Sequence, residues 1–95
     1  MYKITLNGEK TITTSLQLKG NAIEGSLNDK IFAGDFVKIN NYQYHFLVEG
    51  KSYNVEVVKL NAEEKTLVLK VNAVKYSLQL KDKYDELLHN LGLDN

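Results

Sequence analysis

The chain has 95 residues, no cysteine, and twelve basic and twelve acidic residues, so its formal net charge is zero. This length predicts one small domain with a thin core, and the lack of cysteine excludes disulfide bonds and thiolate metal ligands. Every basic residue is lysine; a chain with neither arginine nor a basic excess is not typical of nucleic-acid binders. No apolar run is long enough for a membrane span, and the start lacks the layout of a signal peptide. We therefore expect a cytoplasmic protein without membrane contact.

Apolar and polar residues alternate along most of the first 81 residues. A period of two is typical of strands that bury one face. The clearest alternating segments are 2–6, 12–18, 42–48, 53–60, 67–71 and 74–80. The 22–36 stretch is interrupted by glycine and fits one or two short strands. The pattern predicts a mainly β fold, a curled antiparallel sheet or small barrel of seven to eight strands, with Tyr42 and Tyr44 on the same inner face.

Two local features refine this prediction. Asn7-Gly8 is the residue pair that type I′ hairpin turns prefer, because both positions require positive φ. The apolar phase slips between Val57 and Val58, which indicates a β-bulge that helps the sheet to curl.

Residues 82–92 change to the period of a helix. Asp82 is expected as its N-cap, Gly92 as the residue just past its end, and Leu93 as a fold-back contact of a Schellman motif. The apolar stripe consists of Tyr84, Leu87, Leu88 and Leu91. A helix this short is marginal alone, so we expect it to plug the open inside or end of the sheet. The domain plan is thus strands over 1–81, a helix over 82–92, and the start of a linker at 93–95.

No residue cluster indicates catalysis. His45 and His89 are far apart and lack a spaced carboxylate partner, so no metal site is expected. The paired acids Glu63-Glu64 and Asp85-Glu86 are expected on solvated surfaces, and no serine lies in a nucleophile elbow. We predict that the chain is not an enzyme, has no catalytic residue and binds no metal.

Three segments carry a resemblance to a known family: "MYKITLNGEK", "YHFLVEGKSYNVEVVKLNAEEKTLVLKVN" and "KDKYDELLHNLGLDN". The chain resembles the N-terminal, pre-biotinyl domain of the biotin carboxyl carrier subunit of bacterial acyl-CoA carboxylases, the biotin/lipoyl-attachment proteins. Ala73 departs from the family pattern, which usually has glycine after asparagine. In a two-residue I′ turn, alanine at positive φ costs on the order of 1 kcal/mol, and a longer turn is the alternative.

The resemblance implies a non-catalytic docking domain of a carboxylase or decarboxylase, with biotin carboxylase and carboxyltransferase components as partners. In that family a linker leads to a biotinyl domain whose lysine is flanked by methionines. Met1 is the sole methionine here, so the biotin-acceptor lysine is not in this chain and no cofactor is expected on it. We expect the chain to be a piece of a longer protein, or a natural orphan of the upstream domain.

The outward residues Leu47, Val58 and Val68 are the predicted partner contacts, although Val58 and Val68 could instead cover a second core layer. The alternative function is a small-ligand-binding β-barrel, which predicts an unfilled interior, whereas the leucine-rich helix predicts a filled one. A third possibility is a barrel that stacks single-stranded nucleic acid on Tyr42, Tyr44, Tyr53 and Tyr76, and the charge balance disfavours it.

Overall fold

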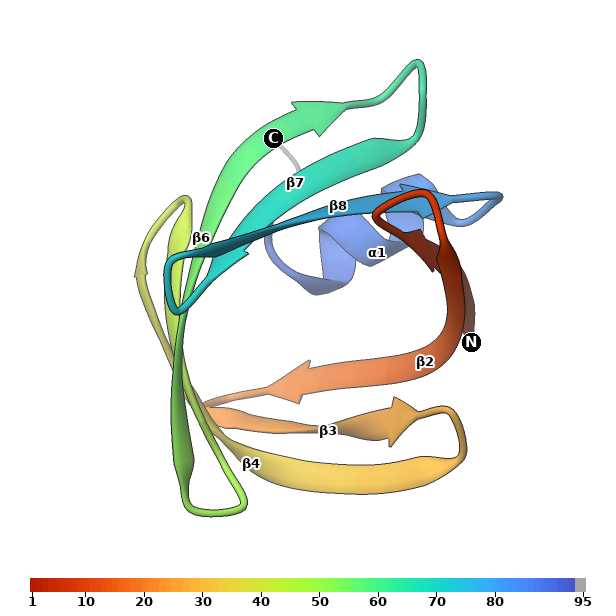
Figure 1. Cartoon of the computed structure of the whole chain (residues 1–95). Coiled ribbons are helices and arrows are strands. Elements are labelled where there is room, and N and C mark those ends of the chain that lie inside the picture. Colours follow the sequence, from red (N-terminus) through yellow and green to blue (C-terminus); the bar gives the residue numbers. More distant parts are fainter. Residues whose placement is uncertain (94–95) are drawn as a thin grey trace.

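The computed structural model describes residues 1–93 as a closed antiparallel β-barrel followed by one short helix (Figure 1). Each strand pairs with the next along the chain, and β1 pairs with β8 to close the barrel. The strands are β1 (Tyr2–Leu6), β2 (Lys10–Lys19), β3 (Ala22–Leu27), β4 (Lys30–Asn40), β5 (Gln43–Val48), β6 (Lys51–Asn61), β7 (Thr66–Val71) and β8 (Val74–Leu80), and the helix is α1 (Tyr84–Asn90). The predicted mainly β class is confirmed, with eight strands; the 22–36 stretch forms β3 and the first part of β4.

The barrel has two different ends. The turns β1–β2, β3–β4, β5–β6 and β7–β8 lie at one end, which we call the open end. The other three turns and α1 lie at the opposite end, the helix end, where the Lys38 side chain donates to the Gly92 carbonyl and the Lys83 side chain to the Met1 carbonyl. In Figure 1 the helix lies within the barrel outline beside β7 and β8, and the region next to β3 and β4 contains no helix.

The turns of the open end share one backbone conformation. Asn7 and Gly8 both have positive φ, which confirms the predicted I′ turn, and Asn28-Asp29 and Glu49-Gly50 repeat it. Asn72 and Ala73 also have positive φ, at 49° and 70°, so the two-residue turn forms despite its alanine. The fold of the barrel therefore holds Ala73 at a positive φ, a conformation that glycine adopts more easily than alanine.

Irregularities in the strands help the sheet to close. The pairing of β6 with β7 shifts between Val57 and Lys59, which confirms the predicted bulge, and a second shift lies between Lys38 and Asn40 in β4. Gly25 and Gly34 lie where neighbouring strands approach closely, since a Cβ at either would clash with the carbonyl oxygen of Ser15 or Leu47. Glycine at such positions lets a barrel strand bend.

The helix begins later than the sequence pattern predicts. Lys83 is the N-cap residue, in the left-handed conformation at φ 59°, and no side chain caps the helix, so the prediction of Asp82 as N-cap is wrong. The reason is tertiary: Leu80 is buried and paired with Ile4, and the chain must reverse direction before Tyr84 to bring that ring into the core. A left-handed residue makes this reversal, and burial of Tyr84 outweighs the loss of a cap.

The end of the helix follows the predicted Schellman motif. Gly92 has a φ of 70°, its N–H donates to the His89 carbonyl at 3.0 Å, and the Leu93 N–H donates to the Leu88 carbonyl at 2.8 Å. The helix therefore ends at Asn90, and Leu93 is fixed by the motif. Of the linker predicted at 93–95, residues 94 and 95 lie outside the described part of the chain. No helix within residues 1–93 is long and apolar enough to cross a membrane.

The core joins the helix to the seam between the first and last strands. The exposed fraction of each core side chain is 4% or less, and the cluster consists of Tyr2, Ile4, Leu67, Leu80, Tyr84 and Leu87. These residues come from β1, β7, β8 and α1 alone. Within that cluster the Tyr84 hydroxyl donates to the Thr66 carbonyl at 2.8 Å and accepts from the Asn61 N–H at 3.2 Å. The predicted plug is thus present, and its buried side chains pack against β1, β7 and β8.

Replacing Ala73 with glycine should stabilise the protein. The substitution removes strain of roughly 1–2 kcal/mol at positive φ and adds backbone freedom to the unfolded chain, so the net gain should be about 0.5–1 kcal/mol. Urea unfolding of the Ala73→Gly variant measures it. Ala62→Gly, in the β6–β7 loop and without positive φ, is the matched control and should not stabilise. Equal effects at both positions would contradict the strain at Ala73.

Removing the Tyr84 hydroxyl should loosen the helix. In the Tyr84→Phe variant the Thr66 carbonyl and the Asn61 N–H lose their shared partner, and the free energy of unfolding should fall by about 1–3 kcal/mol. Tyr42→Phe is the control, because the Tyr42 side chain is 53% exposed, and should change stability by less than about 0.5 kcal/mol. A Tyr84→Phe variant as stable as the parent would show that these bonds do not hold the helix.

Candidate functional site

An apolar cavity of about 210 Å³ lies inside the barrel next to the helix. Side chains from every strand except β4, together with Leu87 and Leu91 of the helix region, form its wall. Only Thr14 and Tyr44 in this wall carry side-chain oxygens. The Thr14 hydroxyl donates to the Ser26 carbonyl at 2.7 Å, and the Tyr44 hydroxyl donates to the Leu91 carbonyl. Because both polar groups are used within the protein, the surface that faces the cavity is wholly apolar.

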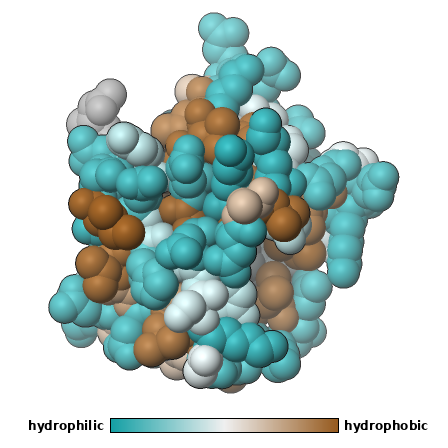
Figure 2. Space-filling view, turned by 60° about the vertical axis from the view of Figure 1, so that its left-hand side comes forward, coloured by the Kyte–Doolittle hydropathy of each residue, from teal (hydrophilic) through white to brown (hydrophobic). Residues whose placement is uncertain are grey.

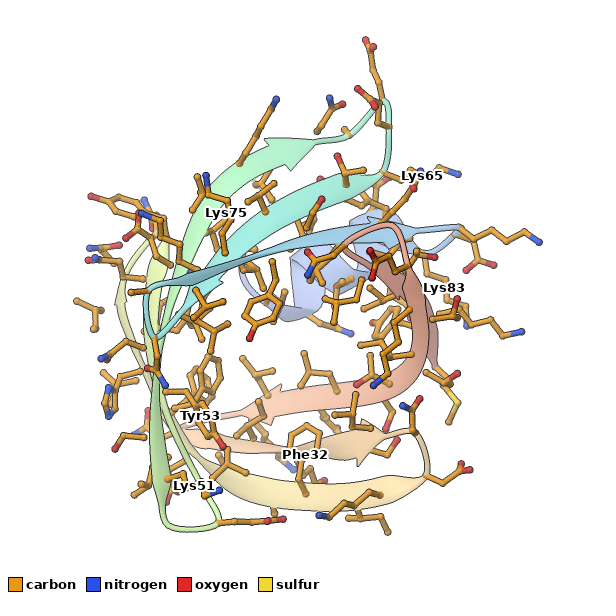
Figure 3. The ribbon with its side chains drawn as sticks, in the orientation of Figure 1. Phe32, Lys51, Tyr53, Lys65, Lys75 and Lys83 are labelled. Atoms are coloured by element: carbon orange, nitrogen blue, oxygen red, sulfur yellow. The ribbon has the colours of Figure 1, made fainter. Side chains whose placement is uncertain are left out.

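A second, wider space of about 490 Å³ forms the mouth of the barrel at the open end. The cavity and the mouth adjoin, because four residues line both: Ile23, Phe46, Val55 and Val71. Phe32 and Tyr53 line the mouth, and Figure 3 shows both side chains on the inner side of the barrel wall. Lys30, Glu49 and Lys51 supply the charges of the mouth. The side chains that line the interior therefore change in character along the barrel. They are charged at the rim, aromatic along the walls of the mouth, and apolar in the cavity beside the helix.

Stacked aromatic rings run along the β4–β5 wall. The Phe46 ring lies 5.8 Å from Phe36 and 5.9 Å from Tyr44, centroid to centroid. The Lys38 ammonium lies 5.8 Å from the Tyr44 ring centroid. Such rings are rigid and offer a large apolar contact area, which suits a wall that must keep its shape beside an unfilled space.

The C-terminal part of the helix closes the helix end of the barrel. The Lys38 ammonium donates to the Gly92 carbonyl at 2.8 Å, and the Asn90 amide donates to the Tyr2 hydroxyl at 2.6 Å. Together with the bond from Tyr44 to Leu91, these contacts satisfy backbone and side-chain groups where the helix ends. The helix end is thus closed by polar contacts, and the cavity communicates with the mouth at the open end.

The predicted partner residues lie on the outer surface but not together. Val58 lies in the bulge of β6, next to the Lys59–Val68 pair, so Val58 and Val68 are neighbours. Leu47 pairs with Asp35 and Ser52, toward the open end of the same side. Val58 is 43% exposed, and no second core layer covers it within the described residues. A docking role for these three residues stays a prediction.

Other exposed apolar residues lie on β4. Ile31, Val37 and Ile39 are exposed at 80%, 58% and 59%, and sequence reasoning missed them because it assigned no alternation phase over this strand. On the face that Figure 2 shows, hydrophobic side chains form separate groups divided by hydrophilic ones. This face therefore carries no single continuous apolar patch.

Of the four tyrosines proposed for base stacking, Tyr44, Tyr53 and Tyr76 lie on the inner face of the barrel and Tyr42 does not. Tyr42 lies in the β4–β5 turn and is 53% exposed, so its predicted inner position beside Tyr44 is wrong. Tyr44 is buried and Tyr53 and Tyr76 are half-buried. The turn ends the alternation before Tyr42, and alternation alone could not locate that turn.

The two histidines and the acidic residues of the described part of the chain do not come together in one cluster. His45 contacts Asn54 at 2.7 Å, between its Nδ1 and the amide oxygen, on the exposed side of β5 and β6. Within residues 1–93, no group of three or more His, Cys, Asp or Glu residues is placed to hold a metal ion. The absence of catalytic activity stays a prediction.

The chain matches no family model, and comparison with curated proteins and with solved structures finds no match. None of these comparisons identifies the chain as part of a biotin carboxyl carrier subunit. The resemblance, and the carboxylase partners and downstream biotin that it implies, stay predictions.

Alkaline pH should weaken the closure of the helix end. Burial raises the pKa of Tyr44 above its ordinary value of 10.0. The unfolded chain therefore releases this proton first, and the stability that the neutral hydroxyl contributes is present below pH 10 and is lost as pH rises through the folded pKa. Urea unfolding between pH 8 and 11 should show a shallower decline for Tyr44→Phe than for the parent. Tyr42→Phe should follow the parent, and parallel declines for all three would refute this role of Tyr44.

Proposed function

We propose that the barrel binds a small apolar or amphipathic ligand between the helix and the open end. The observation that carries this proposal is the unfilled, wholly apolar cavity that adjoins an open mouth. An unfilled interior is what a ligand-binding barrel predicts, whereas a plug that served only to complete the core would leave none. A docking domain does not require such a space.

The size of the barrel is consistent with this proposal. Eight strands enclose an interior that is just wide enough to be filled by side chains or to hold one small ligand. The buried side chains of the helix pack against the side of β1, β7 and β8, where the buried cluster lies. On the other side, Gly25 and Gly34 contribute no side chain to the barrel. The distribution of large and small side chains around the barrel therefore explains the unfilled cavity.

The cavity is suited to a guest that makes no hydrogen bonds. Cavities lined by aliphatic and aromatic residues stay dry, and one of about 150 Å³ is enough to bind benzene. Burying about 200 Å² of apolar ligand surface gains roughly 5 kcal/mol, from which the loss of ligand freedom is subtracted. We therefore expect affinities in the millimolar to micromolar range for simple apolar ligands.

A filling substitution tests the proposal. Val71 lines both the cavity and the mouth, so Val71→Phe should occlude the space. Titration with the neutral fluorescent probe N-phenyl-1-naphthylamine should show enhanced emission with the parent protein and binding weakened at least about tenfold by Val71→Phe, the difference that 1.4 kcal/mol makes.

Val37→Phe is the matched control, because the same change is made on the outer face, where the side chain is 58% exposed. It should bind the probe as the parent does. Circular dichroism and thermal unfolding show whether each variant folds. Probe binding that is absent from the folded parent, or equal in all three proteins, would refute an interior ligand.

A further inference from the structure

Lysine side chains lie at the inward positions closest to the open end. In the antiparallel pairs, directly opposed residues share a face, and Lys30 is opposite Leu27 while Lys51 is opposite Val48. Both pairs line the mouth. The β1–β2 hairpin repeats the arrangement, since Lys10 is opposite Leu6. Three of the four hairpins at this end thus place a lysine on the inner face of the rim.

These lysines recur in a sequence pattern that no core-packing argument requires. An acidic residue precedes each of them in the turn: Glu9 before Lys10, Asp29 before Lys30, and Glu49 before Lys51. The fourth hairpin has Val74 at the equivalent position. If the inner side chains of the rim served only to pack the core, apolar residues would be expected there. The repeated lysine therefore needs another explanation.

The ammonium groups of the mouth have no partner among residues 1–93. Within residues 1–93, Lys30 and Lys51 make neither an ion pair nor a hydrogen bond through their side chains. Glu49, the acidic residue that also lines the mouth, lies in the turn itself, whereas Lys51 lies on the strand. Figure 3 shows Lys51 beside Tyr53 at the edge of the barrel. The two unpaired ammonium groups therefore lie at the rim, next to the aromatic walls of the mouth.

We propose that the ligand is an amphiphile with one anionic head group, which Lys30 and Lys51 hold at the mouth while its alkyl tail lies along the interior. This inference rests on the proposed function and specifies its ligand. The charged head group stays in contact with water at the rim, so it avoids the large cost of burying a charge. The tail meets only apolar surface.

The dimensions of the interior fit a tail of medium length. Val57, which lines the cavity, lies six positions after Lys51, and this corresponds to about 20 Å along β6. With the usual strand tilt of roughly 35–45°, the distance along the barrel axis is about 15 Å. A head group at the rim would thus place the end of such a tail near the helix.

The test compares two ligands with the same chain and different head groups, decanoate and 1-decanol, by displacement of N-phenyl-1-naphthylamine. In the Lys30→Gln/Lys51→Gln variant, decanoate should bind about three- to tenfold more weakly and 1-decanol should be unaffected, because only the carboxylate loses its ion pairs. The difference should shrink in high salt. Lys59→Gln/Lys75→Gln is the control, since both lysines are exposed, are paired with Val68 and Lys70 on the outer face, and should not affect either ligand.

The outcomes separate this inference from the proposed function. If both ligands displace the probe and the mouth lysines do not affect decanoate, the interior site stands and the anionic head group is refuted. If neither ligand binds the folded parent and the probe does not bind either, both proposals fail. A decanoate-specific loss in the mouth variant alone supports the inference.

Discussion

The closure of the barrel between its first and last strands is the constraint on which the rest of the structure depends. Three residue pairs join β1 to β8, from Ile4–Leu80 to Leu6–Leu78, fewer than join any other neighbouring strands. The buried cluster lies behind this seam, where Tyr84 and Leu87 of the helix pack against Tyr2, Ile4 and Leu80. The helix therefore packs behind the strand pairing that has the fewest residue pairs, while the buried Ile23 and Tyr44 lie outside this cluster, on β3 and β5.

That asymmetry connects stability to the proposed function. The side of β1, β7 and β8 carries the buried cluster and the hydrogen bonds of Tyr84, and the other side carries the aromatic wall, the two strand glycines and the mouth. The hydrophobic core of a small domain is thin. An unfilled apolar space of about 210 Å³ should therefore lower the free energy of unfolding by a few kcal/mol, as substitutions that create cavities do. A ligand that fills the space would recover part of this cost, and ligand binding and stability should be coupled.

Local patterns predicted the strands, the Asn7-Gly8 turn, the bulge at Val57 and the Schellman motif at Gly92, because each depends on neighbouring residues. The predicted start of the helix was wrong because Tyr84 forms hydrogen bonds with Asn61 and Thr66, which are far away in sequence. The predicted inner position of Tyr42 was wrong because a turn interrupts the alternation at this residue. The candidate site was predicted only as an alternative, since whether β1 meets β8, and whether Lys30 and Lys51 face inward, depends on strand pairing that composition and periodicity do not determine.

The interior between the helix and the open end is proposed to be an apolar site that accepts a small ligand. Methyl-resolved NMR of the parent protein during titration with benzene tests this most directly. An interior site predicts saturable shifts at the cavity-lining methyl groups of Leu69 and Val71, with none at the outward Val37 and Ile39. Shifts confined to the outer residues, or no saturable shift at any of them, would contradict an interior site.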